Sequence, residues 1–358
     1  MSKNKRLRRR HGKRGRGWLY TGVTLGLVVL AGGGFSYYEY QRLQPQNFFQ
    51  HVPVIAAANA LNSTADGGSG TSNSATPNNT ASGAPTGIKS TVPGTFNVLL
   101  MGTDTRKGQK LGHSDSMMLI HVDMNTHKYS ALSIPRDTRV LFPPYGYTKL
   151  TTVQYMDEAK YGTQAGVIDT VKYIANLTGI PINYYAETDY WGLQDIVDAV
   201  GGINMDLPFN VTLTHPWYPQ DGGMTFTKGV HFVNGRLTTE IVHERYSVPG
   251  IDYGRQQLQE EALLGIAKEL EKPQNYSEIP GVIKALPNYL VATNMTTSDM
   301  MSFLLGVRGD FHPDSQIQYH QIRGKGEVIY NDVLKARDDE VVLQPGQLQT
   351  AAQEYLRG

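Results

Sequence analysis

Three short apolar runs stand out in the second quarter of the chain. They cover residues 96–101, 117–122 and 129–134. Runs of this length that are rich in Val, Leu, Ile and Met predict buried β-strands. Gly102 and Pro135 end the first and third runs, and Asn125 with Thr126 makes a short turn between the second and third. We therefore expect the three strands to run up, down and up.

Helical spacing of apolar residues follows these runs. It recurs in residues 167–175, 193–200, 254–270 and from residue 298 or 299 onward. Gly179 closes the first helix and Gly201 follows the second, as expected of helix C-termini. Strands followed by helices, with further strands between them, predict an α/β fold. We expect a single domain with a central mixed β-sheet flanked by helices over residues 95–338, and a C-terminal tail over 339–358.

The N-terminus has a different pattern. Residues 17–38 contain no charge, and 22 residues of helix span about 33 Å, enough to cross a hydrocarbon core of ~30 Å. Residues 1–16 carry nine Lys or Arg and no acid. This pattern predicts a cytoplasmic basic tail and a transmembrane signal-anchor helix, with all later residues outside the cell membrane in a single-pass topology.

Two other interpretations of this region are a cleaved signal peptide, with small residues at 31–33, and a DNA-binding arm at 1–16. We favour the anchor because the uncharged stretch continues to Tyr38 and ends in tyrosines. Residues 56–94 are rich in Ala, Ser, Thr, Asn, Gly and Pro and lack apolar periodicity. They predict that 39–94 is an extracytoplasmic disordered linker, with a reach of about 35 Å for its low-complexity part.

Charge and cysteine content narrow the classes of function. The whole chain has 33 basic and 32 acidic residues, so the part after residue 16 has 24 basic and 32 acidic residues and a formal charge of −8. The absence of cysteine excludes disulfide frameworks, thiolate metal sites and cysteine nucleophiles.

Acids and arginines lie where the predicted strands end or begin. The end of the first strand, the start of the second and the end of the third share one edge of the sheet if the strands run up, down and up. These segments contain Asp104, Arg106, Asp115, Arg136 and Asp137. Paired carboxylates suit Mg²⁺ and arginine forks suit phosphate oxygens, which predicts a phosphoryl site. The alternative is a set of ordinary surface ion pairs.

A second cluster lies at residues 243–259. Arg255 and Gln259 are four residues apart near the start of a predicted helix, hence on one face and near its positive end. By itself this cluster also fits an ordinary helix surface.

Five segments carry a resemblance to a known family. They are residues 96–106, 114–120, 132–138, 195–203 and 252–257. In this order and spacing, and behind a basic tail, span and linker, they resemble the LytR-CpsA-Psr family of cell-wall glycopolymer ligases over roughly residues 95 to 275. The resemblance implies an extracytoplasmic phosphotransferase of the Gram-positive envelope. Such an enzyme joins a glycopolymer, of the teichoic acid or capsule type, from an undecaprenyl pyrophosphate carrier to peptidoglycan.

The resemblance also implies roles for individual residues. Asp104 and Asp115 look like the magnesium-associated carboxylates. The residues that look like the pyrophosphate-binding set are Arg106, Arg136, Arg245, Arg255 and Gln259. The base for the acceptor hydroxyl is expected among Asp104, Asp115 and Asp137, and an apolar tunnel for the membrane lipid is expected between the sheet and the helices.

Three departures from the family pattern support a second hypothesis. His113, His243 and Leu258 stand where many relatives have arginine. Losing three cations would weaken pyrophosphate binding, at ~1.5–3 kcal/mol for each charge-assisted bond. The second hypothesis is therefore a polyprenyl-phosphate-binding regulatory envelope protein with weak or no ligase activity. A third, a DNA-binding regulator acting through residues 1–16, conflicts with the predicted membrane span, and we expect no nucleic-acid partner.

Overall fold

The structure is a computed structural model that describes residues 38–56, 92–106, 108–272, 279–307 and 311–356. The predicted basic tail, the predicted span up to residue 37 and most of the predicted linker lie outside the described residues. None of the described helices combines the length and apolar character that a bilayer crossing requires.

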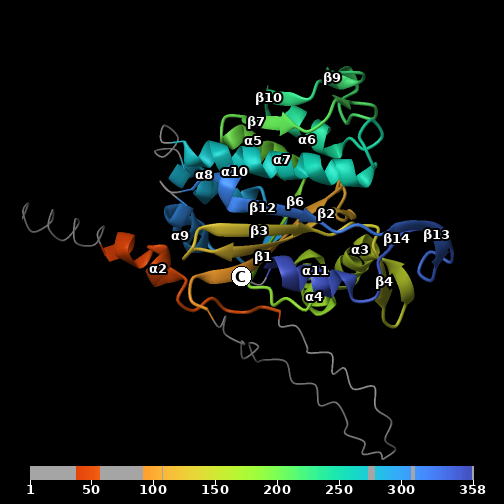
Figure 1. The fold of residues 1–358 in the computed structure, drawn as a ribbon, viewed down its shortest axis with the longest axis horizontal. Helices are drawn as coiled ribbons and strands as arrows, with labels where there is room; N and C mark the ends of the chain where they lie inside the picture. The colour runs from red at the N-terminus through yellow and green to blue at the C-terminus, as the bar shows by residue number, and fades with distance from the viewer. Residues whose placement is uncertain (1–37, 57–91, 107, 273–278, 308–310, 357–358) are drawn as a thin grey trace, which may run out of the picture.

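A six-stranded mixed sheet forms the centre of the molecule (Figure 1). Its strand order is β11-β6-β1-β2-β3-β12; β1 pairs antiparallel with β2 and β2 with β3, whereas β6 and β12 pair parallel with β1 and β3. The strands are β1 (Thr95–Thr103), β2 (Ser114–Asp123), β3 (Lys128–Ser133), β6 (Tyr184–Asp189), β11 (Ala292–Thr293) and β12 (Ile317–Gln321). The predicted mixed α/β fold and the up-down-up order of the first three strands are confirmed.

The three opening strands are continuous apolar runs because both faces of the sheet are covered. Leu99, Leu119 and Leu132 form one cross-strand row, and each is 0% exposed. They belong to the larger apolar cluster, which helices α3 (Leu150–Tyr161), α4 (Thr163–Thr178) and α11 (Gln347–Leu356) cover from below in Figure 1. Gly179 ends α4 in the left-handed conformation, as its position predicts.

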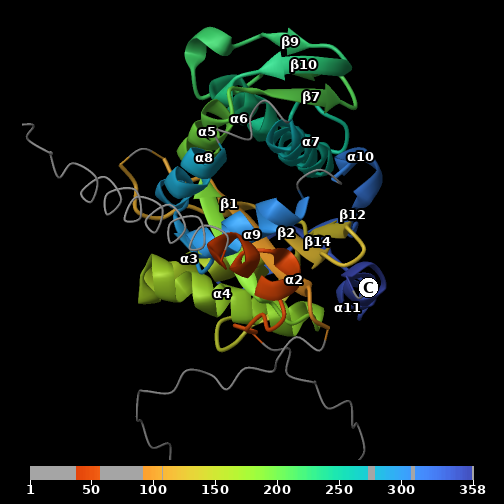
Figure 2. The same cartoon turned by 90° about the vertical axis from the view of Figure 1, so that its left-hand side faces the viewer.

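A second layer lies over the opposite face of the sheet (Figure 2). It contains α5 (Tyr190–Ala199), α6 (Gly235–His243), α7 (Asp252–Glu271), β7 (Ile203–Leu207) and β10 (Gly229–Val233). These elements enclose an apolar cluster of their own, in which Ile203, Met205, Ile241 and Leu258 are fully buried. The layer therefore has its own core.

Smaller elements complete the fold. Two hairpins lie at the right-hand end in Figure 1, β4 (Arg139–Phe142) with β5 (Gly146–Lys149) and β13 (Lys325–Asn331) with β14 (Ala336–Val342). The remaining elements are α2 (Pro45–Phe48), β8 (Val211–Thr212), 3-10 turn Pro219–Asp221, β9 (Thr225–Phe226), α8 (Ile279–Ala285), 3-10 turn Leu286–Asn288, α9 (Thr297–Val307) and α10 (Pro313–Gln316).

The structure extends the folded domain beyond both expected boundaries. At the N-terminal side, Phe49 is 1% exposed and packs on Phe96 with ring centroids 4.8 Å apart, and Ala56 bridges to Ile182. Residues 45–56, expected in the disordered linker, are thus part of the domain because their apolar side chains cover the sheet.

The expected C-terminal tail at 339–358 is also folded. It contains the end of β14 and helix α11, whose Leu348, Ala352 and Leu356 are buried in the main apolar cluster. The repeat of these residues at four-residue spacing gives the helix an apolar face, which the sheet and α4 need as cover.

Candidate active site

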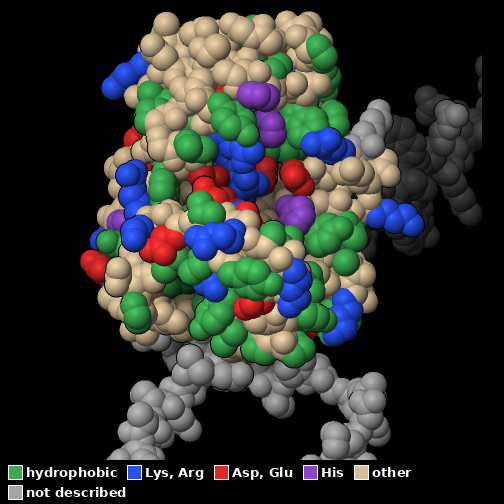
Figure 3. Space-filling view, turned by 90° about the vertical axis from the view of Figure 1, so that its right-hand side faces the viewer, with side chains coloured by type: hydrophobic (Ala, Val, Ile, Leu, Met, Phe, Trp, Pro, Cys, Tyr) green, Lys and Arg blue, Asp and Glu red, His purple; other side chains and the backbone are tan. Residues whose placement is uncertain are grey.

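The loops that carry the predicted site residues meet at one edge of the sheet. The pairing places Gly102 opposite Ser116 and Met118 opposite Ser133, so the end of β1, the start of β2 and the end of β3 are neighbours. The predicted shared edge is confirmed. Acidic, basic and histidine side chains gather in a hollow on this face of the molecule (Figure 3).

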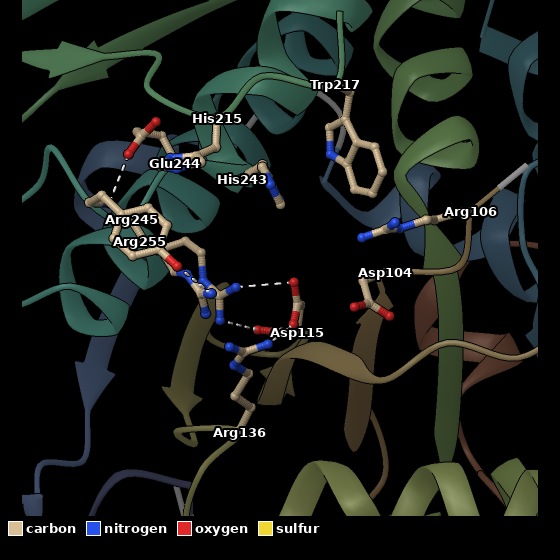
Figure 4. Close-up of a pocket in the computed structure, with 11 residues that line it drawn as sticks. Asp104, Arg106, Asp115, Arg136, His215, Trp217, His243, Glu244, Arg245 and Arg255 are labelled. Carbon is tan, nitrogen blue, oxygen red and sulfur yellow. Dashed lines mark hydrogen bonds and ion pairs between the residues drawn. The ribbon is translucent and has the colours of Figure 1, made fainter. Parts of the chain in front are cut away.

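A pocket of about 260 Å³ opens between this edge and the upper layer. Its lining combines the sheet edge with the loops around α6 and the start of α7 (Figure 4). The lining residues are Asp104, Arg106, Asp115, Arg136, His215, Trp217, His243, Glu244, Arg245, Tyr246 and Arg255.

Asp115 is the centre of the charged cluster in this pocket. Its side chain is 8% exposed; one carboxylate oxygen accepts from Arg136, and the other lies 3.1 Å from Nη1 of Arg255. Nη2 of Arg255 also donates to the main-chain oxygen of Asp115 at 3.0 Å. Burial raises the pKa of Asp115, but Arg255 and Arg136 outweigh it and hold the pKa below its ordinary value. Asp115 is therefore ionised and keeps two guanidinium groups together.

Arg255 is 1% exposed, which is unusual for an arginine on the first turn of a helix. Asp252 at the start of α7 accepts from Arg255, and its Oδ1 lies 3.8 Å from Nε of Arg136. Burial opposes the charge of Arg255, but Asp115 and Asp252 together raise its pKa. The two acids and two arginines thus give this cluster no net charge.

The upper wall of the pocket contains a neutral histidine. The hydroxyl of Tyr190 lies 2.8 Å from Nδ1 of His243 and donates to Asp115 Oδ2 at 3.3 Å. Burial is the main cause that lowers the pKa of His243 to about 4; Arg255 and Arg245 act in the same direction, and the charge of Asp115 opposes them. The imidazole is uncharged at neutral pH.

Two further arginines lie on the rim without acidic partners. Arg106 lies over the ring of Trp217 with its guanidinium carbon 5.1 Å from the ring centroid, and Arg245 Nη2 donates to the Tyr246 hydroxyl at 2.9 Å. In the described part of the chain neither forms an ion pair. They are the pocket cations whose charge is available to an anionic ligand.

Two of the predicted site residues do not line the pocket. Asp137 lies beside it and faces Nε of Arg136 at 3.6 Å and Nζ of Lys149 at 3.3 Å. Gln259 lies one helical turn beyond Arg255, away from the lining. Six of the eight predicted residues, Asp104, Arg106, Asp115, Arg136, Arg245 and Arg255, line it together.

The structure separates the three departures from the family pattern. His113 stacks on Tyr155 with ring centroids 4.4 Å apart, and Leu258 is 0% exposed in the apolar cluster of the upper layer. Only His243 lines the pocket. The expected loss of three clamp cations thus reduces to one position.

Sequence reasoning missed several residues that line the pocket or contact its lining. Asp252 and Tyr190 were not singled out, although Asp252 lies in one of the matching segments. Trp217 and His215 come from an irregular stretch with no distinguishing pattern. Glu244 accepts from the main-chain N–H groups of Thr214, Tyr246 and Ser247 at 2.6, 2.7 and 3.0 Å, and so it joins the loops that form the upper wall.

The pocket can be tested for its fit to magnesium. Asp104 and Asp115 both face it (Figure 4), and Asp104 Oδ1 accepts from the His113 main-chain N–H at 2.7 Å. Among the described residues no group of three or more His, Asp or Glu side chains is arranged to hold a metal. Two carboxylates fit a cation such as Mg²⁺, which takes its remaining ligands from water and substrate phosphates.

Comparisons with known proteins identify the family of this chain. The LytR_cpsA_psr family model matches residues 60–348. The chain is 28% identical over 246 residues to the polyisoprenyl-teichoic acid–peptidoglycan teichoic acid transferase TagU of Bacillus licheniformis, covering 68% of this chain and 73% of that protein. It is 29% identical over 282 residues to TagU of Bacillus anthracis, with 77% and 78% covered.

Solved structures show the same fold. The crystal structure of Bacillus subtilis TagV aligns with a TM-score of 0.59 at 24% identity, covering 73% of this chain and 97% of that one. The structure of TagT bound to LIIa-WTA aligns with a TM-score of 0.56 at 22% identity, covering 75% and 94%. The family match over most of the chain, together with this fold, shows that the protein belongs to the LytR_cpsA_psr family.

Proposed function

We propose that this protein is a phosphotransferase of the cell envelope that joins a polyisoprenyl-linked glycopolymer to peptidoglycan. The observation that carries the proposal is the charge arrangement of the pocket. Asp115 holds Arg136 and Arg255 together, and Arg106 and Arg245 lie on the rim without acidic partners. Four guanidinium groups around one pocket suit a pyrophosphate, whose two phosphoryl groups need their charge neutralised during transfer. The TagU relatives are named for this reaction.

The reaction assigns a task to each group. A hydroxyl of peptidoglycan attacks the phosphorus that carries the glycopolymer, a new P–O bond forms, and the bond to the bridging oxygen of the pyrophosphate breaks. The products are a phosphodiester and polyprenyl phosphate, which keeps the bridging oxygen. Arg106 and Arg245, the two arginines without acidic partners in the described part of the chain, bind the phosphoryl oxygens, and Arg136 and Arg255 line the pocket beside them. The neutral His243 adds no charge to the wall above.

Asp104 is the residue we assign to the proton of the attacking hydroxyl. Of the three carboxylates expected to supply the base, Asp115 already accepts from two arginines and Asp137 lies outside the lining. Asp104 lines the pocket and makes no ion pair in the described part of the chain. One of its oxygens is held by the His113 main-chain N–H, which leaves the other for the proton.

Magnesium is part of this proposal. Asp104 and Asp115 would hold it, and when bound it would supply charge neutralisation on the pyrophosphate. Removal of divalent ions with EDTA should lower donor cleavage, and restoration by Mg²⁺ but not by Na⁺ at equal ionic strength supports the assignment.

We further propose the single-pass topology, with residues 17–38 as the anchor and the domain outside the cell. Its support is the uncharged 22-residue stretch behind nine basic residues. A protease added to intact cells should degrade the domain, and survival of the domain in intact cells would contradict this topology.

Donor cleavage by the full chain in detergent micelles tests the enzymatic proposal. The probe is a polyprenyl pyrophosphate disaccharide with Mg²⁺, and release of polyprenyl phosphate is measured. Arg136→Ala and Asp115→Asn should each lower turnover at least 100-fold, because each leaves a pyrophosphate charge or a buried arginine without its partner. Arg42→Ala, on an exposed arginine far from the pocket, is the matched control. Full turnover of the two pocket variants would exclude the proposal.

One observation favours the second candidate, a polyprenyl-phosphate-binding regulatory protein. His243 is neutral at a position where the family resemblance implies an arginine. If the missing cation limits catalysis, His243→Arg should raise turnover at least tenfold. Unchanged turnover would count against that explanation. Leu258→Arg is not a useful partner in this test, because Leu258 is buried in the upper core.

A further inference from the structure

Two hairpins next to the pocket expose tyrosines that a folded domain normally covers. Tyr147 on β5 is 46% exposed and Tyr330 on β13 is 49% exposed, and Leu141 and Val328 beside them are 52% and 57% exposed. We call these four side chains the tyrosine surface. It lies at the right-hand end of the molecule in Figure 1, and hydrophobic and basic side chains alternate below the pocket in Figure 3.

The tyrosine surface is held in place by buried charge. Glu340 is 0% exposed and pairs with Arg139, whose guanidinium carbon lies 4.5 Å from the ring centroid of Tyr147. Arg139 also donates to the main-chain oxygen of Tyr330 at 3.1 Å. Asp332 accepts from the main-chain N–H of Tyr147 at 2.7 Å and thereby ties one hairpin to the other. The Tyr147 ring and the strand that carries Tyr330 are thus held in place before any ligand arrives, which lowers the entropic cost of binding.

The surface continues directly from the pocket. Lys149 bridges Asp137 at 3.3 Å and Asp338 at 3.0 Å, and Asp137 in turn faces Arg136 in the pocket lining. Strand β4 leads away from this point for four residues, about 13 Å at ~3.3 Å per residue. A linear polymer that reacts in the pocket would therefore pass over Leu141 and Tyr147.

The chemistry of the surface suits a sugar chain better than a membrane. Tyrosine offers a ring face for sugar C–H groups and a hydroxyl for sugar hydroxyls. The exposed charges beside it are mixed, since Arg337 lies next to Asp339 across from Tyr330 and Val328. A surface that binds anionic lipid needs an excess of basic residues. Moreover, α2, which lies shortly after the predicted span in the chain, is at the opposite end of the molecule (Figure 1).

We propose that the tyrosine surface binds the glycan chain of the peptidoglycan acceptor and leads it to the pocket. This inference rests on the proposed function and adds to it a binding surface for the second substrate. The exposed aromatic Phe232 on β10, at 66% exposure, lies in a different layer and provides a matched control.

Binding of the full chain, in detergent micelles, to acid-stripped Gram-positive sacculi tests the inference. Tyr147→Ser with Tyr330→Ser should weaken co-sedimentation at least tenfold, whereas Phe232→Ser should leave it unchanged. Donor cleavage without acceptor should stay at the original rate in both variants, which separates this proposal from the proposed function. Equal binding by the double variant, equal loss in Phe232→Ser, or no binding by the original chain would each overturn the inference.

A fluorophore on one introduced cysteine can distinguish glycan binding from membrane contact at this surface. The chain has no cysteine, so Leu334→Cys, in the turn between β13 and β14 and 55% exposed, can carry one environment-sensitive fluorophore. In the full chain reconstituted into liposomes, muramidase-released glycan fragments should shift its emission, and the shift should be absent in the double variant. A blue-shifted emission from liposomes alone that glycan does not change would mean that this surface faces lipid, and would overturn the inference.

Discussion

Two buried acid clusters flank the start of β2, and they carry opposite protonation states. On the pocket side, Asp115 lies between Arg136 and Arg255 and its pKa is lowered. On the inner side, Glu187 of β6 is 1% exposed and faces Glu158 of α3; burial, and then the charge of Glu158, raise its pKa to about 9. Asp115 and Glu187 are both buried, so the placement of guanidinium groups, and not burial, decides which acid is ionised.

A short hydrogen-bond path joins the two clusters. The main-chain N–H of Ser114 donates to Gln154 at 2.9 Å, and Gln154 in turn donates to Glu158. Ser114 precedes Asp115 in the chain. Protonation of Glu187 leaves the Glu158–Glu187 pair behind the pocket with at most one negative charge, which limits its repulsion of a pyrophosphate near Asp115.

The largest expected effect comes from breaking the pocket cluster. Arg255→Ala leaves Asp115 and Asp252 with one shared arginine and should lower the free energy of unfolding by about 3–5 kcal/mol. Chemical denaturation of the full chain at pH 7 measures it. Arg42→Ala removes an exposed arginine and should change the value by less than about 0.5 kcal/mol. A pocket variant as stable as the control would show that the arginine is not holding the cluster together.

The inner cluster, in contrast, should make the protein less stable as the pH rises. Because its native pKa is raised from 4.5 to about 9, Glu187 contributes stability below pH 4.5 that is lost as pH rises toward 9. Glu187→Gln mimics the protonated acid and should stabilise the protein by about 2–3 kcal/mol at pH 8, with little difference at pH 4.5. Glu327→Gln, on a partly exposed glutamate, should show no such pH dependence. A destabilised Glu187→Gln at pH 8 would refute the protonated state.

His243 provides a further test of the pocket cluster, at low pH. Its native pKa of about 4 lies below the ordinary 6.5, so its contribution to stability is complete above pH 6.5 and is lost as pH falls toward 4. His243→Gln should therefore be more stable than the original chain by about 2 kcal/mol at pH 5, relative to pH 7.5. Melting temperatures at the two pH values report the difference, with the exposed His51→Gln as control. Equal pH profiles for both variants would disprove the neutral histidine.

The smallest expected effect concerns the link between His243 and Asp115. Tyr190→Phe removes the hydroxyl that contacts both residues and should cost about 1 kcal/mol of unfolding free energy. Tyr129→Phe is a suitable control, because that buried hydroxyl has no hydrogen-bond partner in the described part of the chain. NMR titration of His243 in Tyr190→Phe should show a shifted pKa, and an unchanged one would mean that Tyr190 does not contribute to it.

The sequence predicted the sheet edge well because its evidence is local. Apolar runs ended by Gly102 and Pro135, with a short turn between two of them, are enough to place Asp104, Asp115 and Arg136 on neighbouring loops. The motif order then identified the family. The sheet edge and the family motifs both depend on residues that lie near one another along the chain.

The upper wall could not be predicted in the same way. Tyr190 begins α5, Trp217 lies in an irregular loop and Asp252 begins α7, and these come together only when the upper layer packs over the sheet. The side of α7 that faces the pocket was equally undecided. Residues 258 and 259 are three and four positions after Arg255, so the spacing alone allows either Leu258 or Gln259 to lie on the same side of the helix as Arg255. In the structure Leu258 packs into the apolar cluster that contains Ile203 and Ile241.

The sequence by itself determined the strands, the helices, the charged loops and the family, since each rests on short-range patterns of apolar and polar residues. Tertiary structure alone decided which charges are paired and which acids are protonated. Asp115 and Glu187 are both acids on strands of one sheet, and only the arrival of Arg136 and Arg255 from elsewhere in the chain makes one ionised and leaves the other neutral. Electrostatic energy depends on distance through space in a dry interior, and distance along the chain does not encode it.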